Sequence, residues 1–297
     1  MELLKASSKR KVTGIVFVLP ALVCIVILTV YPVYEVVRMS FSEISLGNFG
    51  GGKFVGLENF VRVFQDKVFI RALKNLLLWL VIYVPMHYVL GFLAALALNR
   101  PFRFSNLVRL IIFLPWTFSL VSATLGWMWF LHTDYGLLNA LLRNIGLEGF
   151  IRKWLSDPSI ALYSLMVVNT WYQYPFVMLG LLAALQTVPE DLIAAARVDG
   201  ANRLQTFFHV VLPSIKVSAG LILILSLIYA MQAFTTIWIL TGGGPANATE
   251  LPATLIYKNA FTYLNWSKAS AMSVLLFVFS SFAIIPYVRL ATREAEV

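Results

Sequence analysis

The polar groups that could do chemistry in this sequence are neutral, and they lie inside two long apolar runs. The candidates are Asn169, Gln173, Tyr174, Gln232, Thr235 and Thr236. Asn169 and Gln173 are four residues apart, as are Gln232 and Thr236, so each pair shares one face of a helix. Amides and hydroxyls beside aromatic rings suit the hydroxyl groups and apolar faces of a neutral sugar. The alternative interpretation is that these groups hydrogen-bond one helix to another.

Six apolar runs must position these groups, and each is roughly 20 residues long, as a bilayer core requires. The chain has 297 residues, of which 60% are hydrophobic and 12% charged, whereas soluble domains carry about 25% charged residues. We therefore predict an all-α integral membrane protein, with a single transmembrane domain over residues 1–297. The predicted spans cover about residues 14–37, 75–98, 108–131, 160–185, 217–240 and 269–290.

Charge is almost absent from the middle of these runs. Away from the span ends there is no Asp, Glu, Lys or Arg, and His87 is the only imidazole. A charge at mid-bilayer costs about 2.5–3.5 kcal/mol and usually serves ion or proton coupling or catalysis. A proton-coupled carrier and a membrane enzyme are therefore disfavoured, and His87 is interpreted as a packed residue rather than a proton relay. The net charge of +9 lies around span ends, where headgroups explain it better than nucleic acid does.

Three other features invite functional interpretations that their context does not support. The glycine-rich run 47–54 has the spacing of a phosphate-binding loop up to Lys53, but Phe54 replaces the Ser or Thr that binds magnesium. Cys24 is the only cysteine, and no metal-ligand cluster or nucleophile–base arrangement is evident from spacing. The basic N-terminus could begin a signal peptide, but its apolar run is long and lacks a small-residue cleavage pattern, which favours a retained first span.

The polar connection at residues 189–213 has helical character. Pro189 suits the start of a helix, and Glu190 and Asp191 suit the positive end of its dipole. Gly200 stands where a helix C-terminus needs a left-handed residue. Leu204, Phe207, Phe208 and Val211 then predict a second short helix that runs to Pro213. The pattern therefore predicts two small helices with a glycine joint, serving either as a docking element or as a plain connector.

Positive charge is densest in the N-terminus, in the turn at residues 99–106 and in the tail. Short basic segments stay on the cytoplasmic side, so we predict that both termini and the 189–213 connection are cytoplasmic. The two longer loops would then lie outside. The first contains Phe60, Val63 and Phe64 at helical spacing, which predicts a short helix lying on the membrane.

The segment DLIAAARVDGA, with Phe207, Phe208 and Leu212-Pro213 after it, resembles the EAA loop of binding-protein-dependent ABC importer permeases. Five more blocks resemble the carbohydrate-uptake branch, in the subunit type similar to the larger maltose permease. They are LPALVCIVILTVYPVYEVVRMSFSE, FVGLENF, GLLNALL, ALQTVPEDL and LTGGGPANATE. The resemblance covers nearly the whole chain and implies the type I ABC importer permease core of six transmembrane helices.

The resemblance also implies what this subunit works with. It implies a sugar importer of a bacterial or archaeal cytoplasmic membrane, driven by alternating access, in which this chain is not an enzyme and binds no cofactor. Its implied partners are a second permease subunit, two ATP-binding subunits that hold ATP and magnesium, and an extracytoplasmic solute-binding protein. Residues 189–213 would be the coupling loop. The coupling residues implied by position are Glu190, Ala194, Ala195, Ala196, Asp199, Gly200 and Ala201.

One departure from the family pattern bears on this coupling. The family's leading Glu falls at Ala194, and Glu190, one helical turn earlier, is the candidate substitute. Two alternatives to a sugar permease remain from the sequence: a permease of the same superfamily for a polyamine or phosphate, and a channel. A charged solute would call for charged groups along its path, and a channel would need no ATPase.

Overall fold

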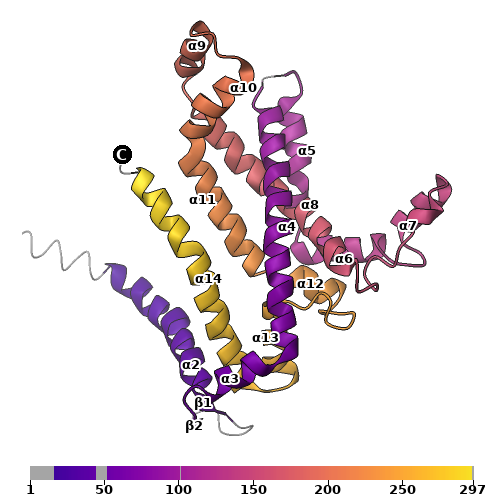
Figure 1. Cartoon of the computed structure of the whole chain (residues 1–297), viewed down its shortest axis with the longest axis vertical. Coiled ribbons are helices and arrows are strands. Elements are labelled where there is room, and N and C mark those ends of the chain that lie inside the picture. The colour runs from indigo at the N-terminus through magenta and orange to yellow at the C-terminus, as the bar shows by residue number, and fades with distance from the viewer. Residues whose placement is uncertain (1–16, 45–51, 101, 296–297) are drawn as a thin grey trace, which may run out of the picture. The chain divides into compact units, whose positions relative to one another are not determined.

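The computed structural model describes residues 17–44, 52–100 and 102–295, and most of them are helical (Figure 1). The chain divides into two compact units. One consists of Met1–Gln65 with Ile256–Leu276, and the other consists of Asp66–Leu255 with Phe277–Val297. The basic residues 5–11 and most of the glycine-rich run 47–54 lie outside the described residues.

The first unit begins with one continuous helix, Phe17–Ser40, which includes the π-helical turn η1 (Val26–Val30) and α2 (Tyr31–Ser40). It has 24 residues, and none of its most apolar window is buried. The predicted first span is therefore confirmed as a helix over its described residues, and it ends at Ser40, three residues beyond the predicted end at about residue 37. Its apolar side chains face outward because nothing else in this unit covers them.

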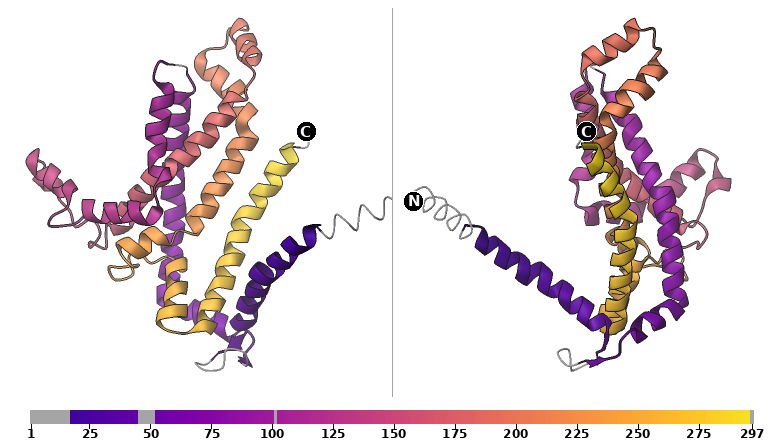
Figure 2. Two further views of the ribbon diagram at one scale, coloured as in Figure 1. Left: turned by 180° about the vertical axis from the view of Figure 1, so that it is seen from behind. Right: turned by 60° about the vertical axis from the view of Figure 1, so that its left-hand side comes forward.

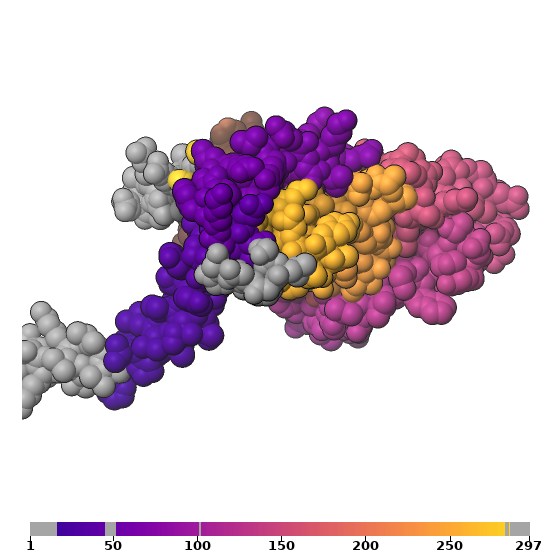
Figure 3. Space-filling view, turned by 90° about the horizontal axis from the view of Figure 1, so that it is seen from below, coloured from indigo at the N-terminus to yellow at the C-terminus, as the bar shows by residue number. Residues whose placement is uncertain are grey.

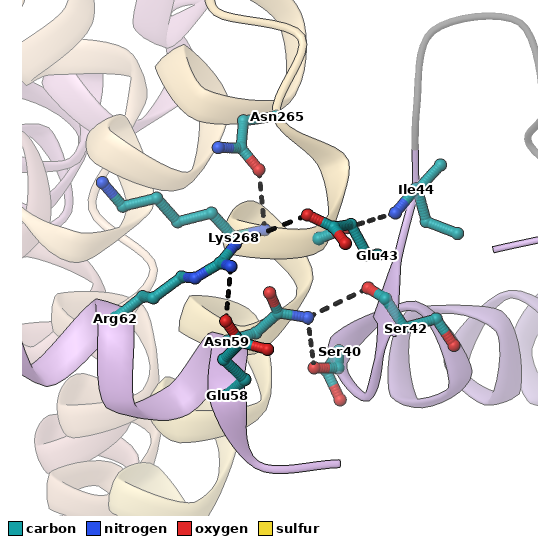
Figure 4. A network of polar contacts seen from close by, with 10 residues as sticks. Ser40, Ser42, Glu43, Ile44, Glu58, Asn59, Arg62, Asn265 and Lys268 are labelled. Atoms are coloured by element: carbon teal, nitrogen blue, oxygen red, sulfur yellow. Dashed lines mark hydrogen bonds and ion pairs between the residues drawn. The ribbon is translucent and has the colours of Figure 1, made fainter. Parts of the chain in front are cut away.

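A polar corner holds the rest of the first unit together. It joins the end of α2, β1 (Ser42–Glu43), α3 (Glu58–Gln65) and the first turn of α14 (Trp266–Ala295), as Figure 4 shows. Asn59 is buried, and its amide nitrogen donates to the carbonyls of Ser40 at 3.0 Å and Ser42 at 2.9 Å. The amide of Ile44 donates to the hydroxyl of Ser267 at 2.8 Å. Because these bonds satisfy backbone groups at a chain reversal, they fix where each segment turns.

The short helix predicted in the first loop is confirmed as α3. Two residues of its predicted apolar face, Phe60 and Val63, are buried, whereas Phe64 is 56% exposed. β1 pairs antiparallel with β2 (Lys53–Phe54), so that Ser42 faces Phe54 across the ladder.

Three long helices form the centre of the second unit: α4 (Lys67–Leu98), α8 (Ala161–Gln186) and α11 (Leu212–Met231). Each packs against the other two, and Figures 1 and 2 show them side by side. Two glycines permit the close approach. A Cβ on Gly91 of α4 would lie 2.7 Å from Val177 of α8, and one on Gly180 of α8 would lie 2.9 Å from Ile222 of α11. Small residues at such contacts let membrane helices pack backbone to backbone.

The apolar core of this unit lies where these three helices meet near the coupling segment. Buried residues from all three helices form it, and they include Ala95, Leu98, Val177, Leu181, Leu185, Ile215 and Ile222. In a membrane, burial against protein gains packing contacts rather than escape from water. The core therefore fixes the ends of α4, α8 and α11 from which the 189–213 segment extends.

The predicted third span is wrong in one respect, because it is broken. It consists of α5 (Ser105–Thr117) and α6 (Leu120–Phe130), which are bent by 91°. Phe118 adopts an extended conformation at the break, and its carbonyl accepts a hydrogen bond from the hydroxyl of Tyr172 at 3.2 Å. The apolar run continues across the break, so its composition does not indicate the bend.

The fifth span also differs from its prediction. The second short helix, α10 (Arg203–Thr206), does not stop at Pro213, because the π-helical turn η3 (Phe207–Val211) joins it to α11. A π-helical turn is wider than an α-helical one, and it lies where the proline ring would crowd an α-helical carbonyl. At the other end α11 stops at Met231, and α12 (Thr235–Leu240) follows after an irregular Gln232–Phe234 turn.

The predicted break after Thr241 is confirmed. Gly242 and Gly243 have φ of +58° and +86°, and the backbone of this loop is bound to α4. The Asn75 amide donates to three loop carbonyls, those of Asn247, Ala248 and Glu250, at 3.3, 3.2 and 2.9 Å. Figure 3 shows orange atoms of this region beside purple atoms of the α4 segment. The loop is thereby fixed to the start of α4.

The remaining elements are short except for the last. They are α7 (Leu137–Asn144), η2 (Glu148–Phe150), α9 (Glu190–Val198), α13 (Pro252–Tyr257), η4 (Lys258–Thr262) and α14. Among the described residues, three helices are long and apolar enough to cross a membrane, or up to five if each bent pair counts as one span. α14 adds a shorter apolar stretch, Trp266–Phe282. The all-α membrane fold is confirmed, and the number six stays a prediction.

Candidate functional site

A cavity of about 430 Å³ lies among α4, α5, α8 and the break between α11 and α12. Neutral side chains and aromatic rings line it. The lining consists of Tyr83, Trp116, Leu120, Asn169, Tyr172, Gln173, Tyr229, Gln232, Ala233, Phe234, Thr235 and Thr236. Five of the six predicted polar candidates therefore meet at one place, although Gln173 and Gln232, the two nearest in sequence across the gap, are 59 residues apart.

Two of the five candidates hydrogen-bond to each other. The hydroxyl of Thr236 donates to the amide oxygen of Asn169 at 3.2 Å, and the amide nitrogen of Asn169 donates to the carbonyl of Leu165 at 3.0 Å. This pair therefore connects α8 to α12, as the interpretation of these groups as contacts between helices expected. Its remaining hydrogen-bonding capacity is what Asn169 could offer a solute.

Gln173 and Gln232 are different, because their amides have no hydrogen-bond partner among the described residues. Gln173 is only 9% exposed, yet it lines the cavity. An amide carries two donors and an acceptor, and burying it without partners costs about 1–3 kcal/mol. A ligand with hydroxyl groups, or water, would satisfy both amides.

Tyr174 is the one predicted candidate that does not line the cavity. Its backbone carbonyl lies close to Gly91 of α4. Tyr172 lines the cavity in its place, because two residues correspond to about 200° around a helix. Tyr174 therefore lies outside this cavity, and its role as a sugar contact stays a prediction.

Three aromatic rings at the cavity were missed by reasoning from the sequence. Tyr83, Trp116 and Tyr229 come from α4, α5 and α11. Phe176 joins the last two, since its ring lies 5.8 Å from that of Trp116 and 5.9 Å from that of Tyr229. No spacing rule relates residues on three different helices, so only the packing of α4, α5, α8 and α11 could place them together.

The 189–213 segment forms a second candidate site. Glu190 and Asp191 occupy the first turn of α9, and Arg197 occupies its last turn. Gly200 has φ of +83°, which confirms the predicted left-handed position. Its amide donates to the Arg197 carbonyl at 3.1 Å, and the Ala201 amide donates to the Ala196 carbonyl at 2.9 Å. This pair of bonds is the Schellman arrangement, which ends α9 and turns the chain toward α10.

The start of α10 carries a capping box that the sequence reasoning overlooked. The Asn202 side chain accepts from the Gln205 amide at 2.9 Å, and the Gln205 side chain accepts from the Asn202 amide at 2.8 Å. The signal was present as Asn-x-x-Gln immediately after the glycine. With the Schellman arrangement it fixes the backbone on both sides of Gly200, so the joint between α9 and α10 has a defined geometry.

The surface of this segment is exposed. No residue of α9 is buried, and Ala194 and Ala195 present small side chains to the surroundings. Large apolar side chains accompany them: Val198 is 87% exposed and Leu204 is 70% exposed. Exposed apolar side chains on a polar segment are typical of a surface that a partner covers.

A larger cavity, of about 920 Å³, separates this segment from the end of α4. Arg100, Arg197 and Arg203 line it, together with Asn99 and Asn202. None of the three arginines forms an ion pair with a described residue. Among the described residues, no group of three His, Cys, Asp or Glu could hold a metal ion.

Comparison with known proteins places these sites in context. Residues 87–294 match the family model described as binding-protein-dependent transport system inner membrane component. The sulfoquinovosyl glycerol transport system permease protein SmoG of Agrobacterium fabrum is 34% identical over 94% of this chain and 90% of its own length. The trehalose/maltose transport system permease protein MalF of Thermococcus litoralis is 32% identical over 92% of this chain and 91% of its own.

Solved structures of similar fold include a chain of a bacterial ABC transporter involved in the import of the acidic polysaccharide alginate. It aligns with a TM-score of 0.83 at 24% identity and covers 99% of both chains. A chain of the inward-facing MetNI methionine ABC transporter aligns with a TM-score of 0.54 at 17% identity, over 75% of this chain and 94% of that one.

Proposed function

Because this chain belongs to the binding-protein-dependent transport system inner membrane component family, we propose that it forms half of the translocation path of an ATP-driven sugar importer. The observation that carries this proposal is the uncharged cavity lined by Gln173, Gln232 and Thr235. Its free amides match sugar hydroxyls, and its rings match the apolar faces of a sugar. Relatives named for maltose, trehalose, xylose and arabinose transport support the class of solute.

The proposed solute is neutral. None of the residues that line the cavity carries a charge at neutral pH. A polyamine, phosphate or uronate would enter this cavity without a counter-charge, and an unpaired charge in a low-dielectric site is costly. Gln173, Gln232 and Thr235 are proposed as direct contacts. Asn169 and Thr236 would mainly hold α8 against α12 while exposing their remaining polar atoms.

The energy for transport would come from outside this chain. The proposed coupling segment is 189–213, with α9 docked on an ATP-binding subunit that holds ATP and magnesium. Its small face at Ala194–Ala196 and its exposed Val198 are suited to such a partner. The Gly200 joint would transmit motion as a rigid body, because the hydrogen bonds on both sides of it fix its geometry. This chain would itself hydrolyse nothing and bind no cofactor.

The proposed assembly contains a second permease subunit, two ATP-binding subunits and an extracytoplasmic solute-binding protein, with both termini of this chain in the cytoplasm. A related chain belongs to an alginate transporter solved with a bound periplasmic protein, which supports such an assembly. The second permease would complete the path, since α5, α8 and α11 provide only one wall of it. Residues 1–297 would act as one permease domain.

Reconstitution of the full assembly in vesicles tests the proposal. We expect ATP-dependent uptake of at least one sugar from a panel of xylose, arabinose, maltose and trehalose, and no uptake of spermidine or phosphate. Uptake of spermidine or phosphate in preference to every sugar would reject a sugar path. Solute flux that does not depend on ATP would indicate a channel.

The double variant Gln173→Ala with Gln232→Ala tests the site within that assembly. We expect uptake to fall about tenfold or more, since each lost hydrogen bond is worth about 0.5–1.5 kcal/mol. Gln186→Ala, at the exposed end of α8, is the matched control because it removes an amide outside the cavity. If the double variant transports sugar and stimulates ATP hydrolysis as the wild type does, the two amides are contacts between helices.

A further inference from the structure

The cavity of about 920 Å³ beside the coupling segment carries positive charge that the described residues around it do not balance. Arg100, Arg197 and Arg203 line it, and no Asp or Glu is among the described residues that line it. All three arginines are exposed, and in the described part of the chain their guanidinium groups have no hydrogen-bond or ion-pair partner. Like charges around one concave site raise its potential and attract an anion.

The three arginines come from elements whose backbone is fixed. Arg100 follows the end of α4, where the Arg109 side chain donates to the Leu98 carbonyl at 2.8 Å. Arg197 lies in the last turn of α9, and Arg203 begins α10, on the two sides of the glycine joint. The Schellman arrangement and the capping box fix that joint. The positions from which the three charges enter the cavity are therefore set by the fold.

Much of the remaining lining is apolar. Large apolar side chains from α4, α8, α9 and η3 contribute to it, namely Leu96, Leu185, Ile193, Phe207 and Val211. The ring of Phe207 lies 6.0 Å from that of Phe92 on α4, so this wall packs against the long helices. A small inorganic anion would leave the wall uncovered. A ligand with an anionic group and an apolar body would match both parts of the lining.

The position of the cavity identifies that ligand as a lipid. It adjoins the ends of two helices that are long and apolar enough to cross a membrane, 67–98 and 203–240. Figure 1 shows α9, α10 and the turn between α4 and α5 at one end of this unit, the end that we predict to be cytoplasmic. Lipid phosphates lie at the ends of such helices, and basic pockets between helix ends on the cytoplasmic side bind anionic headgroups.

We propose that this cavity binds the headgroup of an anionic phospholipid. The phosphate lies between Arg100 and the two arginines of the coupling segment, and the first acyl carbons lie against Leu96 and Phe207. A phosphate held in this way connects the end of α4 to both sides of the glycine joint. Anionic lipid therefore strengthens the attachment of the coupling segment to the transmembrane helices. The binding goes beyond the proposed function, and only its effect on coupling rests on that function.

Photo-crosslinking of the full assembly in vesicles tests the binding. The probe is a phosphatidylglycerol with a photoreactive group near its headgroup, diluted in phosphatidylcholine. We expect crosslinks to peptides that contain residues 96–100 and 201–211, suppressed by excess unlabelled phosphatidylglycerol and not by more phosphatidylcholine. Arg100→Gln should lower this crosslinking about fivefold, because one basic residue near an anionic headgroup contributes about that factor. Arg100→Lys keeps the charge and should retain most of it.

Arg103→Gln is the matched control. Arg103 belongs to the same turn between α4 and α5 and is also exposed, but its guanidinium lies over the Phe104 ring at 5.5 Å and it does not line the cavity. Both glutamine variants remove one charge from the same turn, so both weaken general attraction to an anionic bilayer equally. We expect Arg103→Gln to crosslink as the wild type does. Equal losses in the two variants would overturn the cavity site.

The effect on coupling is measured in the same vesicles by replacing phosphatidylcholine stepwise with phosphatidylglycerol. We expect sugar-stimulated ATP hydrolysis to rise about fivefold in the wild type, the low end of usual coupling between sites, and to rise less in Arg100→Gln. Soluble glycerol phosphate added to neutral vesicles should not produce the rise, because it has no apolar body. An equal rise with glycerol phosphate would overturn the lipid and assign the cavity to a free anion.

An acidic side chain of an ATP-binding subunit is the competing occupant of the cavity. In that case the full assembly would show no crosslinks there, and Arg100→Gln would lower the amount of ATP-binding subunit that copurifies. Those results would overturn the lipid site. The proposed function fails separately, since a wild-type assembly that crosslinks phosphatidylglycerol at the cavity but imports no sugar rejects the sugar path alone.

Discussion

Among single residues, Gly200 is the position of the coupling segment whose backbone conformation most restricts substitution. Its φ of +83° excludes proline, whose φ is fixed near −65°. The Gly200 N–H also donates a hydrogen bond to the Arg197 carbonyl, and proline has no N–H. We expect Gly200→Pro to insert in the membrane and to support less than a tenth of wild-type sugar uptake. Uptake into vesicles and quantification of the membrane-inserted chain check this together.

Gly146 offers a matched control for that substitution. It has φ of +76° at the end of α7, and Gly146 and Leu147 donate to the carbonyls of Arg143 and Leu142 in the same Schellman arrangement. Gly146→Pro therefore carries the same local strain in a different part of the chain. If both proline variants lose uptake equally, the effect of Gly200→Pro is general misfolding and not loss of coupling.

Glu190 is the second residue whose role can be isolated. It lies four residues before Ala194, so both share one face of α9, and both are exposed. If Glu190 replaces the charge that the family has at the Ala194 position, Glu190→Ala should lower sugar-stimulated ATP hydrolysis severalfold. Asp191→Ala is the control, because Asp191 is also in the first turn and also favours the helix dipole. Equal losses in both variants would assign the effect to helix stability instead.

At the scale of elements, the sequence predicted the helices and chain breaks that depend on apolar periodicity and on turn residues. The helices α4, α8 and α11, the joint at Gly200 and the break at Gly242 follow from apolar length and from glycine's freedom at positive φ. The bend between α5 and α6 does not, because Phe118 and Ser119 are ordinary residues in a continuous apolar run. A tertiary contact accompanies the bend, namely the hydrogen bond from the Tyr172 hydroxyl to the Phe118 carbonyl.

The candidate site shows the same limit. Asn169, Gln173 and Gln232 were identified because polar groups are rare in apolar runs. Whether Tyr172 or Tyr174 lines the cavity depends on how α8 is rotated about its axis relative to α4, and side-chain packing determines that rotation. Which amides bond within the protein and which stay free also depends on atomic positions. Sequence periodicity therefore finds the faces of helices, while the pairing of those faces comes from the fold.

One element-scale prediction concerns the polar corner of the first unit. Asn59 is buried and holds two carbonyls of the α2–β1 turn. We expect Asn59→Ala to destabilise this corner by about 1–3 kcal/mol, since both carbonyls lose their donor. Limited proteolysis within residues 40–65 should become faster. Arg62→Ala is the control, because its ion pairs with Glu58 and Glu43 are more than half exposed and contribute little.

At the scale of the whole molecule, two features indicate one transport direction. The uncharged cavity lies between the long helices, and the exposed face of α9 lies at the end of those helices that adjoins the coupling segment. A sugar can be bound and released step by step along such a path only if the far end opens to the cytoplasm. The orientation of the 189–213 segment is therefore the property on which the proposed mechanism depends most.

Cysteine labelling in a Cys24→Ala background measures that orientation directly, since Cys24 is exposed and is the only cysteine of the chain. Val198→Cys places a thiol at an 87% exposed position on α9. We expect a membrane-impermeant maleimide to label it in inverted vesicles and not in right-side-out vesicles, because the segment should face the cytoplasm. Added ATP-binding subunits should then protect it, since α9 would be buried in their interface.

Ile145→Cys is the control for the other side of the membrane. Ile145 is 66% exposed at the end of α7, in a loop that we expect on the outer side. It should react in right-side-out vesicles and should not respond to the ATP-binding subunits. Labelling of Val198→Cys from outside would place the coupling segment on the wrong side for any ATPase, and labelling without protection would remove its docking role. Either result would leave the sugar cavity without a source of energy.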